Sequence, residues 1–222
     1  MSSHLRTWVA LVPIQAPPRA KSRLVGLHGR EELAWAMACD ALVALSTSPN
    51  VQAVYAMIPD GGDIPSALGV HVLTDAEPGN LNASLGAAAR FIADREGDNG
   101  LAIVLADVPC IRPVDFAAAL LAATTTSIIS DQQGTGTTML FDPIGTSLPD
   151  QFQPRFGSRS CAAHVSAGAR NIASELPKES RIRLQRDVDT AVDLWDALRI
   201  GVGEYTSRWS EAFAAPLQRL RH

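Results

Sequence analysis

Apolar residues in this chain fall into short runs that alternate with longer segments of helical periodicity. The run Leu101-Ala102-Ile103-Val104-Leu105 contains no polar residue, which is typical of a strand buried on both faces of a parallel sheet. Trp8–Val12 is predicted to be the first strand, and Glu31–Leu45 has the apolar spacing of a helix. The same patterns predict strands at Val51–Ile58, Val70–Leu73, Ser127–Ser130, Thr137–Phe141 and Asn171–Leu176, and helices at Asn82–Ala93, Val114–Ala123, Ser158–Val165 and Ala191–Leu198. Because strands alternate with helices, we expect an α/β fold: a single domain with a mostly parallel, twisted sheet flanked by helices.

A last amphipathic helix is predicted at Tyr205–Leu220, after a break at Gly201 and Gly203. Its apolar residues form one stripe, which consists of Trp209, Phe213, Leu217 and Leu220. Such a stripe either covers the core of its own chain or contacts a second copy in a homodimer, and both alternatives stay open. We therefore divide the chain into a main domain, residues 1–203, and a C-terminal helix, residues 204–222.

The composition excludes several classes of protein. A chain of 222 residues with 46% apolar and 19% charged residues is long enough for one substantial core and is ordinary for a globular protein. The net charge of -4 argues against nucleic-acid binding, because nucleic-acid modules usually carry a basic field. The apolar stretch Trp8–Ile14 is too short to span a membrane and is interrupted by Pro13. Three widely spaced cysteines, Cys39, Cys110 and Cys161, suggest neither a disulfide framework nor a zinc site, which favours a reducing cytoplasm.

Three aspartates far apart in the sequence are candidate ligands of a divalent metal ion. Asp107 directly follows the buried strand, so its carboxylate should lie at the carboxyl end of that strand, where open α/β sheets bind ligands. Asp187 and Asp189 are separated by one residue, so in an extended segment both side chains project to the same side. Carboxylates of this kind suit Mg²⁺, which completes its shell with water and substrate phosphate. The alternative is that Asp107 caps a loop and that Asp189 or Thr190 caps the following helix.

A basic segment follows the first strand and contains Arg19, Lys21 and Arg23. Lysine binds phosphate as a point charge and arginine as a bidentate fork, so the three cations together can neutralise the triphosphate of a nucleotide. The segment is not a Walker loop, because the glycines of that motif are missing. A loop with three basic residues is also common on a solvated surface, which is the alternative interpretation.

Two glycine-containing segments are candidate anion sites. In Phe156-Gly157-Ser158-Arg159-Ser160, Gly157 permits close approach of the backbone, and Ser158 is predicted to cap a helix whose first N–H groups can bind an anion. In Gly134-Thr135-Gly136-Thr137-Thr138, hydroxyl and amide groups can hold a carboxylate or a phosphate. Each segment also has an ordinary interpretation, as a helix entry and as a turn into a strand.

The segment Pro78-Gly79-Asn80-Leu81-Asn82 predicts a loop before a helix, with Asn82 as the N-cap. Amide side chains at this place can read the edge of a nucleobase. His164 lies within a predicted helix, where a lone histidine more often packs or faces solvent, and we assign it no role.

Taken in order, six segments resemble the motifs of one family, the 2-phospho-L-lactate guanylyltransferases. Its bacterial members include the phosphoenolpyruvate guanylyltransferases of the deazaflavin coenzyme F-420 pathway. The resemblance covers residues 8–203. It rests on Ala20-Lys21-Ser22-Arg23-Leu24, Gly79-Asn80-Leu81-Asn82, Leu105-Ala106-Asp107-Val108-Pro109, Gly134-Thr135-Gly136-Thr137-Thr138, Phe156-Gly157-Ser158-Arg159-Ser160 and Asp187-Val188-Asp189-Thr190.

The resemblance implies a fold similar to the nucleotide-diphospho-sugar transferases. It also implies a reaction that joins GMP from GTP to the phosphate of a small phosphorylated three-carbon acid, with Mg²⁺ as cofactor and pyrophosphate as the leaving group. The acid would be phosphoenolpyruvate or 2-phospho-L-lactate, with 3-phosphoglycerate as a further candidate. Together with the patterns above, it assigns metal ligands (Asp107, Asp187, Asp189), catalytic residues (Asp107, Lys21, Arg23), acid-binding residues (Thr138, Gly157, Ser160) and nucleotide-binding residues (Arg19, Lys21, Arg23, Gly79, Asn82). The chain departs from the family at Gln15, where a lysine is usual.

The expected mechanism is an in-line attack of the acid's phosphate on the α-phosphorus of GTP. A general base is not required, because a phosphate nucleophile is already ionised near neutral pH. Two alternatives stay open: another nucleotidyltransferase of the same fold with a sugar-phosphate or molybdopterin acceptor, and a nucleotide-binding module without turnover, for which Gln15 is the hint.

Overall fold

The computed structural model of the protein describes residues 6–14, 29–59, 62 and 64–218. Its strands are β1 (Trp8–Pro13), β2 (Val51–Ile58), β3 (His71–Thr74), β4 (Gly100–Val104), β5 (Ser127–Ser130), β6 (Thr137–Asp142) and β7 (Arg170–Asn171). Its helices are α1 (Arg30–Ser46), α2 (Leu81–Glu96), α3 (Pro113–Ala122), α4 (Ser160–Ser166), α5 (Lys178–Leu184), α6 (Ala191–Ile200) and α7 (Glu204–Gln218), with short 3-10 turns at η2 (Ser66–Leu68) and η3 (Ala173–Glu175).

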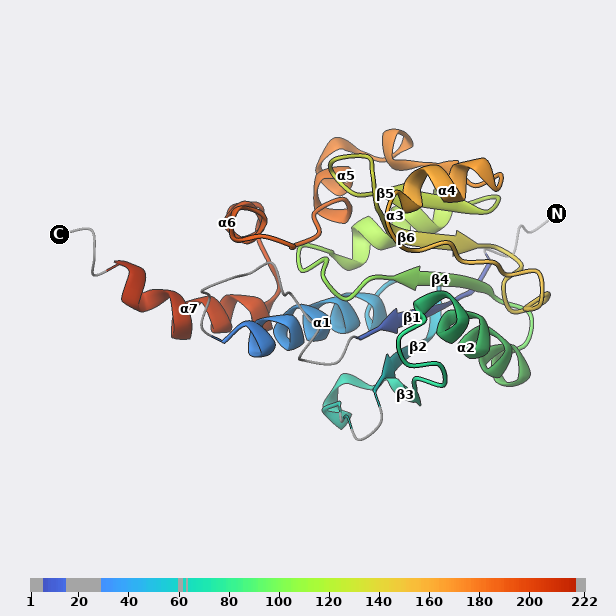
Figure 1. The fold of residues 1–222 in the computed structure, drawn as a ribbon, viewed down its shortest axis with the longest axis horizontal. Helices are drawn as coiled ribbons and strands as arrows, with labels where there is room; N and C mark the ends of the chain where they lie inside the picture. Colours follow the sequence, from blue (N-terminus) through green and yellow to red (C-terminus); the bar gives the residue numbers. More distant parts are fainter. Residues whose placement is uncertain (1–5, 15–28, 60–61, 63, 219–222) are drawn as a thin grey trace.

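The strands form one seven-stranded sheet in the order β3-β2-β1-β4-β6-β5-β7 (Figure 1). All neighbouring strands are parallel except β6, which runs antiparallel to both β4 and β5. The α/β class and the mostly parallel sheet are therefore confirmed. The exception has a local cause: the turn at residues 131–136 leads β5 straight back into β6, as a short connection between paired strands requires.

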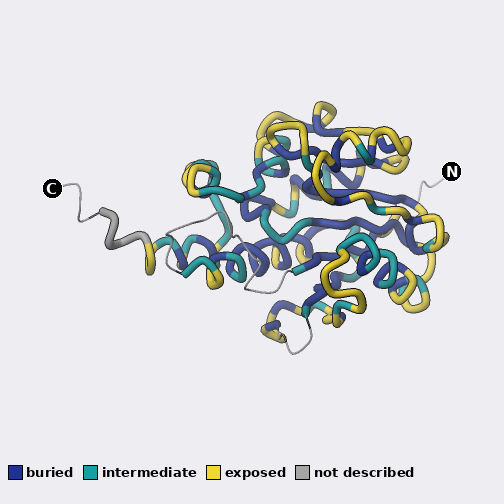
Figure 2. The backbone as a smooth tube through the Cα atoms, viewed as in Figure 1, coloured by how far each residue is buried: buried dark blue, intermediate teal, exposed yellow. Residues whose placement is uncertain are grey.

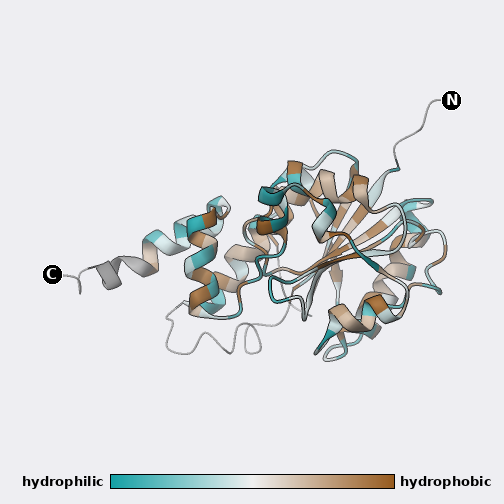
Figure 3. Cartoon of the chain, turned by 90° about the horizontal axis from the view of Figure 1, so that it is seen from above, coloured by the Kyte–Doolittle hydropathy of each residue, from teal (hydrophilic) through white to brown (hydrophobic). Residues whose placement is uncertain are grey.

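Helices cover both faces of the sheet, and the alternation of side chains along β1 shows how. Ala10 and Val12 lie in one buried cluster with α1 and α3, whereas Val9 and Leu11 lie in another with α2. The central strands are buried along their length and coloured mainly as hydrophobic (Figures 2 and 3). A third cluster forms where α1 meets α6 and α7. Each fully buried Val or Leu stabilises the fold by about 1.5–3 kcal/mol.

The structure corrects two predictions in the second half of the chain. The predicted strand Asn171–Leu176 is cut to the two residues of β7, because the Asn171 side chain accepts a hydrogen bond from the N–H of Ala173 (3.2 Å) and turns the chain into η3. Helix α5 was not predicted. Its seven residues, Lys178–Leu184, carry three cations and too short an apolar pattern to indicate a helix.

The C-terminal helix is docked on α1. Asp40 of α1 accepts hydrogen bonds from the backbone N–H groups of Tyr205 and Thr206, both at 2.9 Å, and so caps the start of α7. Trp209 is buried and donates its indole N–H to the carbonyl of Gly29 (2.8 Å). The first turns of α7 therefore cover the core. Phe213, the next residue of the predicted stripe, is 40% exposed and stacks on Trp209, with 5.4 Å between the ring centroids. The side chain of Leu217 and the whole of Leu220 lie outside the described part of the structure, and the homodimer stays a prediction.

No helix in the described part of the chain has the length and apolar character needed to cross a bilayer. Its three cysteines are buried free thiols, as their spacing predicts.

Candidate active site

A large cavity lies at the carboxyl ends of β1 and β4, the edge where an open α/β sheet binds ligands. It encloses about 690 Å³, enough for a nucleotide-sized ligand. Four aspartates and one arginine are among its described lining residues. The polar lining consists of Asp107, Asp131, Gln133, Thr135, Gly136, Thr137, Gly157, Ser158, Arg159, Ser160, Asp187 and Asp189.

The backbone brings the three predicted metal ligands together. The N–H of Val188 donates to the carbonyl of Asp107 (3.0 Å), which fixes the second acidic segment beside the end of β4. Val188 is fully buried in the cluster between α1, α6 and α7, so its neighbours Asp187 and Asp189 point the other way, into the cavity. The prediction that alternation places both carboxylates on one side is confirmed. Thr190, and not Asp189, caps α6, in a capping box with Asp193.

These carboxylates repel one another. Burial, followed by the nearby charges of Asp107, Asp189 and Asp131, raises the pKa of Asp187 to about 7. Near neutral pH the group is therefore poised between its two protonation states, and a bound cation would favour the charged state. Among the described residues, no group of three or more His, Cys, Asp or Glu side chains is closed tightly enough to form a ready-made metal cage.

Asp131 is a fourth carboxylate of this cavity that the sequence analysis missed. It is buried and accepts hydrogen bonds from the N–H groups of Thr135 (2.8 Å) and Gly136 (2.6 Å). A Cβ at Gly136 would lie 2.6 Å from the Asp131 carboxylate, so glycine is required there by close approach. The available signal was its place after β5, at the same edge of the sheet as Asp107. We call Asp107, Asp131, Asp187 and Asp189 the acidic wall.

Another part of the cavity boundary is formed by residues 155–160, of which 156–160 line the cavity, and we call this segment the loop wall. Gly157 has φ +139°, a conformation that favours glycine. The prediction that Ser158 caps α4 is wrong. The cap position is occupied by Arg159, which is in the left-handed conformation and makes no side-chain cap hydrogen bond. The Arg159 side chain is exposed and supplies the single cation of the described lining. Gly157 and Ser160 line the cavity, and their binding of the acid stays a prediction.

Thr138 is placed differently from the prediction. It is buried, and its hydroxyl lies 2.9 Å from the carbonyl of Leu184 and 3.2 Å from that of Ile129. The cavity is lined instead by Thr137, because successive residues of a strand point to opposite faces. The Thr138 side chain therefore holds α5 against the sheet, its carbonyl accepts from the N–H of Leu105 (3.0 Å), and Thr138 is not among the residues that line the cavity.

Asn82 is not the N-cap of α2. That position is taken by Asn80, whose side-chain oxygen accepts from the N–H of Ala83 (3.2 Å). Asn82 lies in the first turn of the helix and hydrogen bonds with the backbone of Phe156 across the cavity edge. Leu81 lines the cavity, whereas Gly79 and Asn82 are not among its lining residues. Nucleotide binding by Gly79 and Asn82 stays a prediction.

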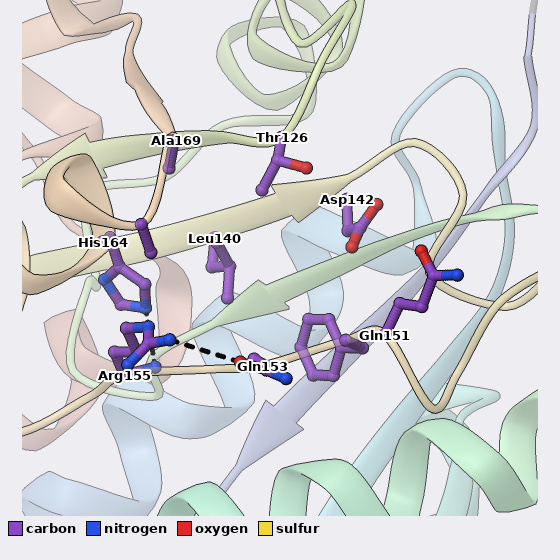
Figure 4. Close-up of a pocket in the computed structure, with 11 residues that line it drawn as sticks. Thr126, Leu140, Asp142, Gln151, Gln153, Arg155, His164 and Ala169 are labelled. Atoms are coloured by element: carbon purple, nitrogen blue, oxygen red, sulfur yellow. Dashed lines mark hydrogen bonds between the residues drawn. The ribbon is translucent and has the colours of Figure 1, made fainter.

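A second, smaller cavity of about 220 Å³ lies behind the loop wall (Figure 4). Its lining includes Arg155, His164 and the buried Asp142, whose pKa is raised by burial. The His164 side chain is itself buried, and burial lowers its pKa. It is therefore a neutral packing residue whose ring nitrogens are both within hydrogen-bond distance of a partner.

The basic segment with Arg19, Lys21 and Arg23, and also Gln15, lies outside the described residues. The described residue that precedes the segment, Ile14, lines the large cavity.

Fold and site together define a class. The structure is similar to a Desulfovibrio desulfuricans crystal structure assigned as a nucleotide-diphospho-sugar transferase, with a TM-score of 0.64, 16% identity and coverage of 93% of this chain and 96% of that chain. It is also similar to a nucleotidyl transferase from Methanothermobacter thermautotroptrophicus, with a TM-score of 0.52, 14% identity and coverage of 87% and 98%. The protein therefore has the fold of the nucleotide-diphospho-sugar transferases.

Relatives by sequence narrow this class to a family. The chain is 36% identical to the phosphoenolpyruvate guanylyltransferase of Salinispora arenicola, over 91% of this chain and 92% of the relative, and 37% identical to that of Streptomyces avermitilis, over 90% and 92%. The protein belongs to the phosphoenolpyruvate guanylyltransferase family, and the resemblance seen in the six motifs is confirmed. No family model matches the chain.

Proposed function

We propose that the protein transfers GMP from GTP to phosphoenolpyruvate. A phosphate oxygen of the acid forms a bond to the α-phosphorus of GTP, the bond between the α- and β-phosphates breaks, and pyrophosphate leaves. The observation that carries the proposal is the joining of Asp107 to Asp187 and Asp189 at one strand-end cavity, in a chain whose relatives bear this activity in their names.

We propose Mg²⁺ as the cofactor. The donor set fits this ion, because Asp107, Asp187 and Asp189 are hard oxygen ligands, and burial together with the nearby charges of Asp107 and Asp189 raises the pKa of Asp187. A closed cage is not needed, since Mg²⁺ commonly takes one or two protein carboxylates and completes its shell with water and phosphate oxygens. When bound, the ion would neutralise the charge that develops on the transferred phosphoryl group.

The loop wall supplies the positive charge that the acidic wall lacks. Phosphoenolpyruvate is an anion, so it is expected on the side with Gly157, Ser160 and the cation of Arg159, away from the carboxylates. Lys21 and Arg23, helped by Arg19, are proposed to meet the GTP phosphates. With both reactants held and no proton to remove from the nucleophile, these residues act by positioning and by charge stabilisation.

The F-420 pathway, a cytoplasmic location and a homodimer are further parts of this proposal. The first rests on the family resemblance, the second on the three free thiols, and the third on the amphipathic pattern of the C-terminal helix.

Pyrophosphate release tests the proposal directly. Purified protein is given GTP and Mg²⁺ with phosphoenolpyruvate, 2-phospho-L-lactate or 3-phosphoglycerate in turn, with ATP and CTP as controls. Release that depends on GTP and phosphoenolpyruvate is expected. Release with another acid would change the acceptor, and a protein that binds GTP but releases no pyrophosphate with any of the three would favour a sugar-phosphate or molybdopterin acceptor, or a binding module.

A further inference from the structure

The loop wall has almost no regular backbone partners of its own. Residues 152–158 contain no helix or strand, and the first N–H of α4, that of Ser160, already donates to the carbonyl of Gly157 (3.2 Å). An irregular segment at a cavity must find other partners for its backbone groups, or its position is poorly fixed. In this protein two side chains from distant parts of the sequence supply them.

The Asn82 side chain pairs with both backbone groups of one residue, as a neighbouring strand would. Its side-chain oxygen accepts from the N–H of Phe156 (2.8 Å), and its side-chain N–H donates to the carbonyl of the same residue (2.9 Å). Both ends of the amide are therefore used on one residue that lies 74 positions away in the sequence. These two bonds leave one N–H and one lone pair of the amide for any other partner.

His164 binds the backbone of the preceding residue, Arg155. Its Nε2 accepts from the N–H of Arg155 (2.9 Å; both residues are labelled in Figure 4). Its Nδ1 lies 3.1 Å from the hydroxyl of Thr137. When Nε2 is an acceptor, the neutral ring carries its proton on Nδ1, the nitrogen beside the Thr137 hydroxyl. The ring also packs edge-on against Phe156, at 5.2 Å between centroids. His164 thus joins the loop wall to β6 through a side chain that lines the large cavity.

We propose that Asn82 and His164 are positioning residues for the acid substrate: they hold the backbone of residues 155–156 so that Gly157 and Arg159 face the acidic wall. This inference rests on the proposed function. It reassigns Asn82 from the nucleotide to the acid, which gives it a distinct kinetic consequence. Loosening the loop wall should weaken binding of the acid and leave binding of GTP unchanged.

The test combines steady-state kinetics with amide hydrogen exchange. Asn82→Ala should raise KM for phosphoenolpyruvate about tenfold, the effect of losing well-placed hydrogen bonds, with KM for GTP within about twofold of wild type. Peptides that cover residues 153–159 should exchange faster, because the Phe156 amide loses its acceptor. His164→Phe keeps a ring against Phe156 and should act in the same direction.

Asn80→Ala is the matched control, since it removes the same side chain two residues earlier, where it caps its own helix. It should lower the free energy of unfolding by about as much as one cap, with both KM values and the exchange of residues 153–159 unchanged. If His164→Phe fails to fold, Asn82→Ala and Asn80→Ala decide by themselves.

Two results would overturn the inference. One is a rise in KM for GTP without a rise for the acid in Asn82→Ala, which would restore the nucleotide assignment. The other is an unchanged exchange rate at residues 153–159. Failure of the proposed function looks different: wild-type protein would then release no pyrophosphate with phosphoenolpyruvate, while the exchange measurement would still show whether the two side chains hold the segment.

Discussion

The acidic wall and the loop wall line the same cavity, and they are built in different ways. The acidic wall is carried by strand ends and by a backbone bond between Val188 and Asp107, so its position follows from the sheet. Residues 152–158 of the loop wall and its approach contain no helix or strand, and the side chains of Asn82 and His164 hold this segment. The comparison teaches that charge can be placed by a rigid frame, whereas the shape of an anion site depends on side chains that never touch the anion.

The largest effect is expected from breaking the acidic wall. Asp107→Asn keeps the shape of the side chain and removes a charge that the proposed metal ion requires, so turnover should fall roughly 10³-fold, equivalent to several kcal/mol of transition-state stabilisation. Pyrophosphate release measures the loss, and circular dichroism checks the fold. Asp150→Asn is the control, because that carboxylate is highly exposed, with a side-chain relative exposure of 87%. A folded Asp107→Asn or Asp107→Ala protein with near wild-type turnover would contradict the metal assignment.

Because Asp187 belongs to the acidic wall, its titration should make that wall, and not the loop wall, depend on pH. Its folded pKa of about 7 lies above the value of 3.8 for an ordinary aspartate, so the folded state holds the proton more tightly. In the metal-free protein, the contribution of Asp187 to the free energy of unfolding is fully present below about pH 4. This contribution is lost as the pH rises to about 7. Since Mg²⁺ requires the ionised form, the apparent affinity for Mg²⁺ should be about tenfold weaker at pH 6 than at pH 8.

Thermal unfolding with and without Mg²⁺ from pH 5 to pH 8.5 measures both effects. In Asp187→Asn the pH-dependent fall in stability should become shallower and the Mg²⁺-induced shift should shrink. An identical pH profile in wild type and variant would show that another group is responsible.

A substitution in the loop wall should reduce activity less, and it should weaken binding of the acid only. Arg159→Gly removes a cation and relieves a left-handed backbone that costs a non-glycine residue about 1 kcal/mol. KM for phosphoenolpyruvate is expected to rise about tenfold, as for a lost charged hydrogen bond, with the free energy of unfolding unchanged or slightly higher. Arg155→Ala is the matched control, because that arginine side chain faces the second cavity (Figure 4). Equal KM values in the two variants would place the acid elsewhere.

The smallest effect is expected from a substitution in β6, and it tests whether Thr138 contacts the acid. Thr138→Val keeps the shape of the side chain and removes the hydroxyl that contacts the carbonyl of Leu184, so the protein should lose about 1 kcal/mol of stability. KM for phosphoenolpyruvate should stay within twofold of wild type, since the hydroxyl is turned away from the cavity. Thr138→Ser should restore the stability. A tenfold rise in KM for Thr138→Val would instead show that the Thr138 hydroxyl reaches the acid.

The sequence by itself determined the order of nearly all strands and helices, because strands and helices bury apolar residues at different periods. It also determined the position of Asp107 at a strand end and the common side of Asp187 and Asp189, because both follow from strand geometry and from nothing farther away. The family followed from motifs of the same local kind.

Only the tertiary structure decided which groups meet. Asp131 joins the acidic wall because β5 and β4 end at the same edge of the sheet, and Thr138 turns from the cavity because α5 packs behind it. Asn82 and His164 became partners of residues 155–156 through bonds between segments that the sequence keeps apart. Local patterns record how a residue relates to its neighbours along the chain, whereas hydrogen bonds between distant segments depend on how the whole sheet and its helices pack.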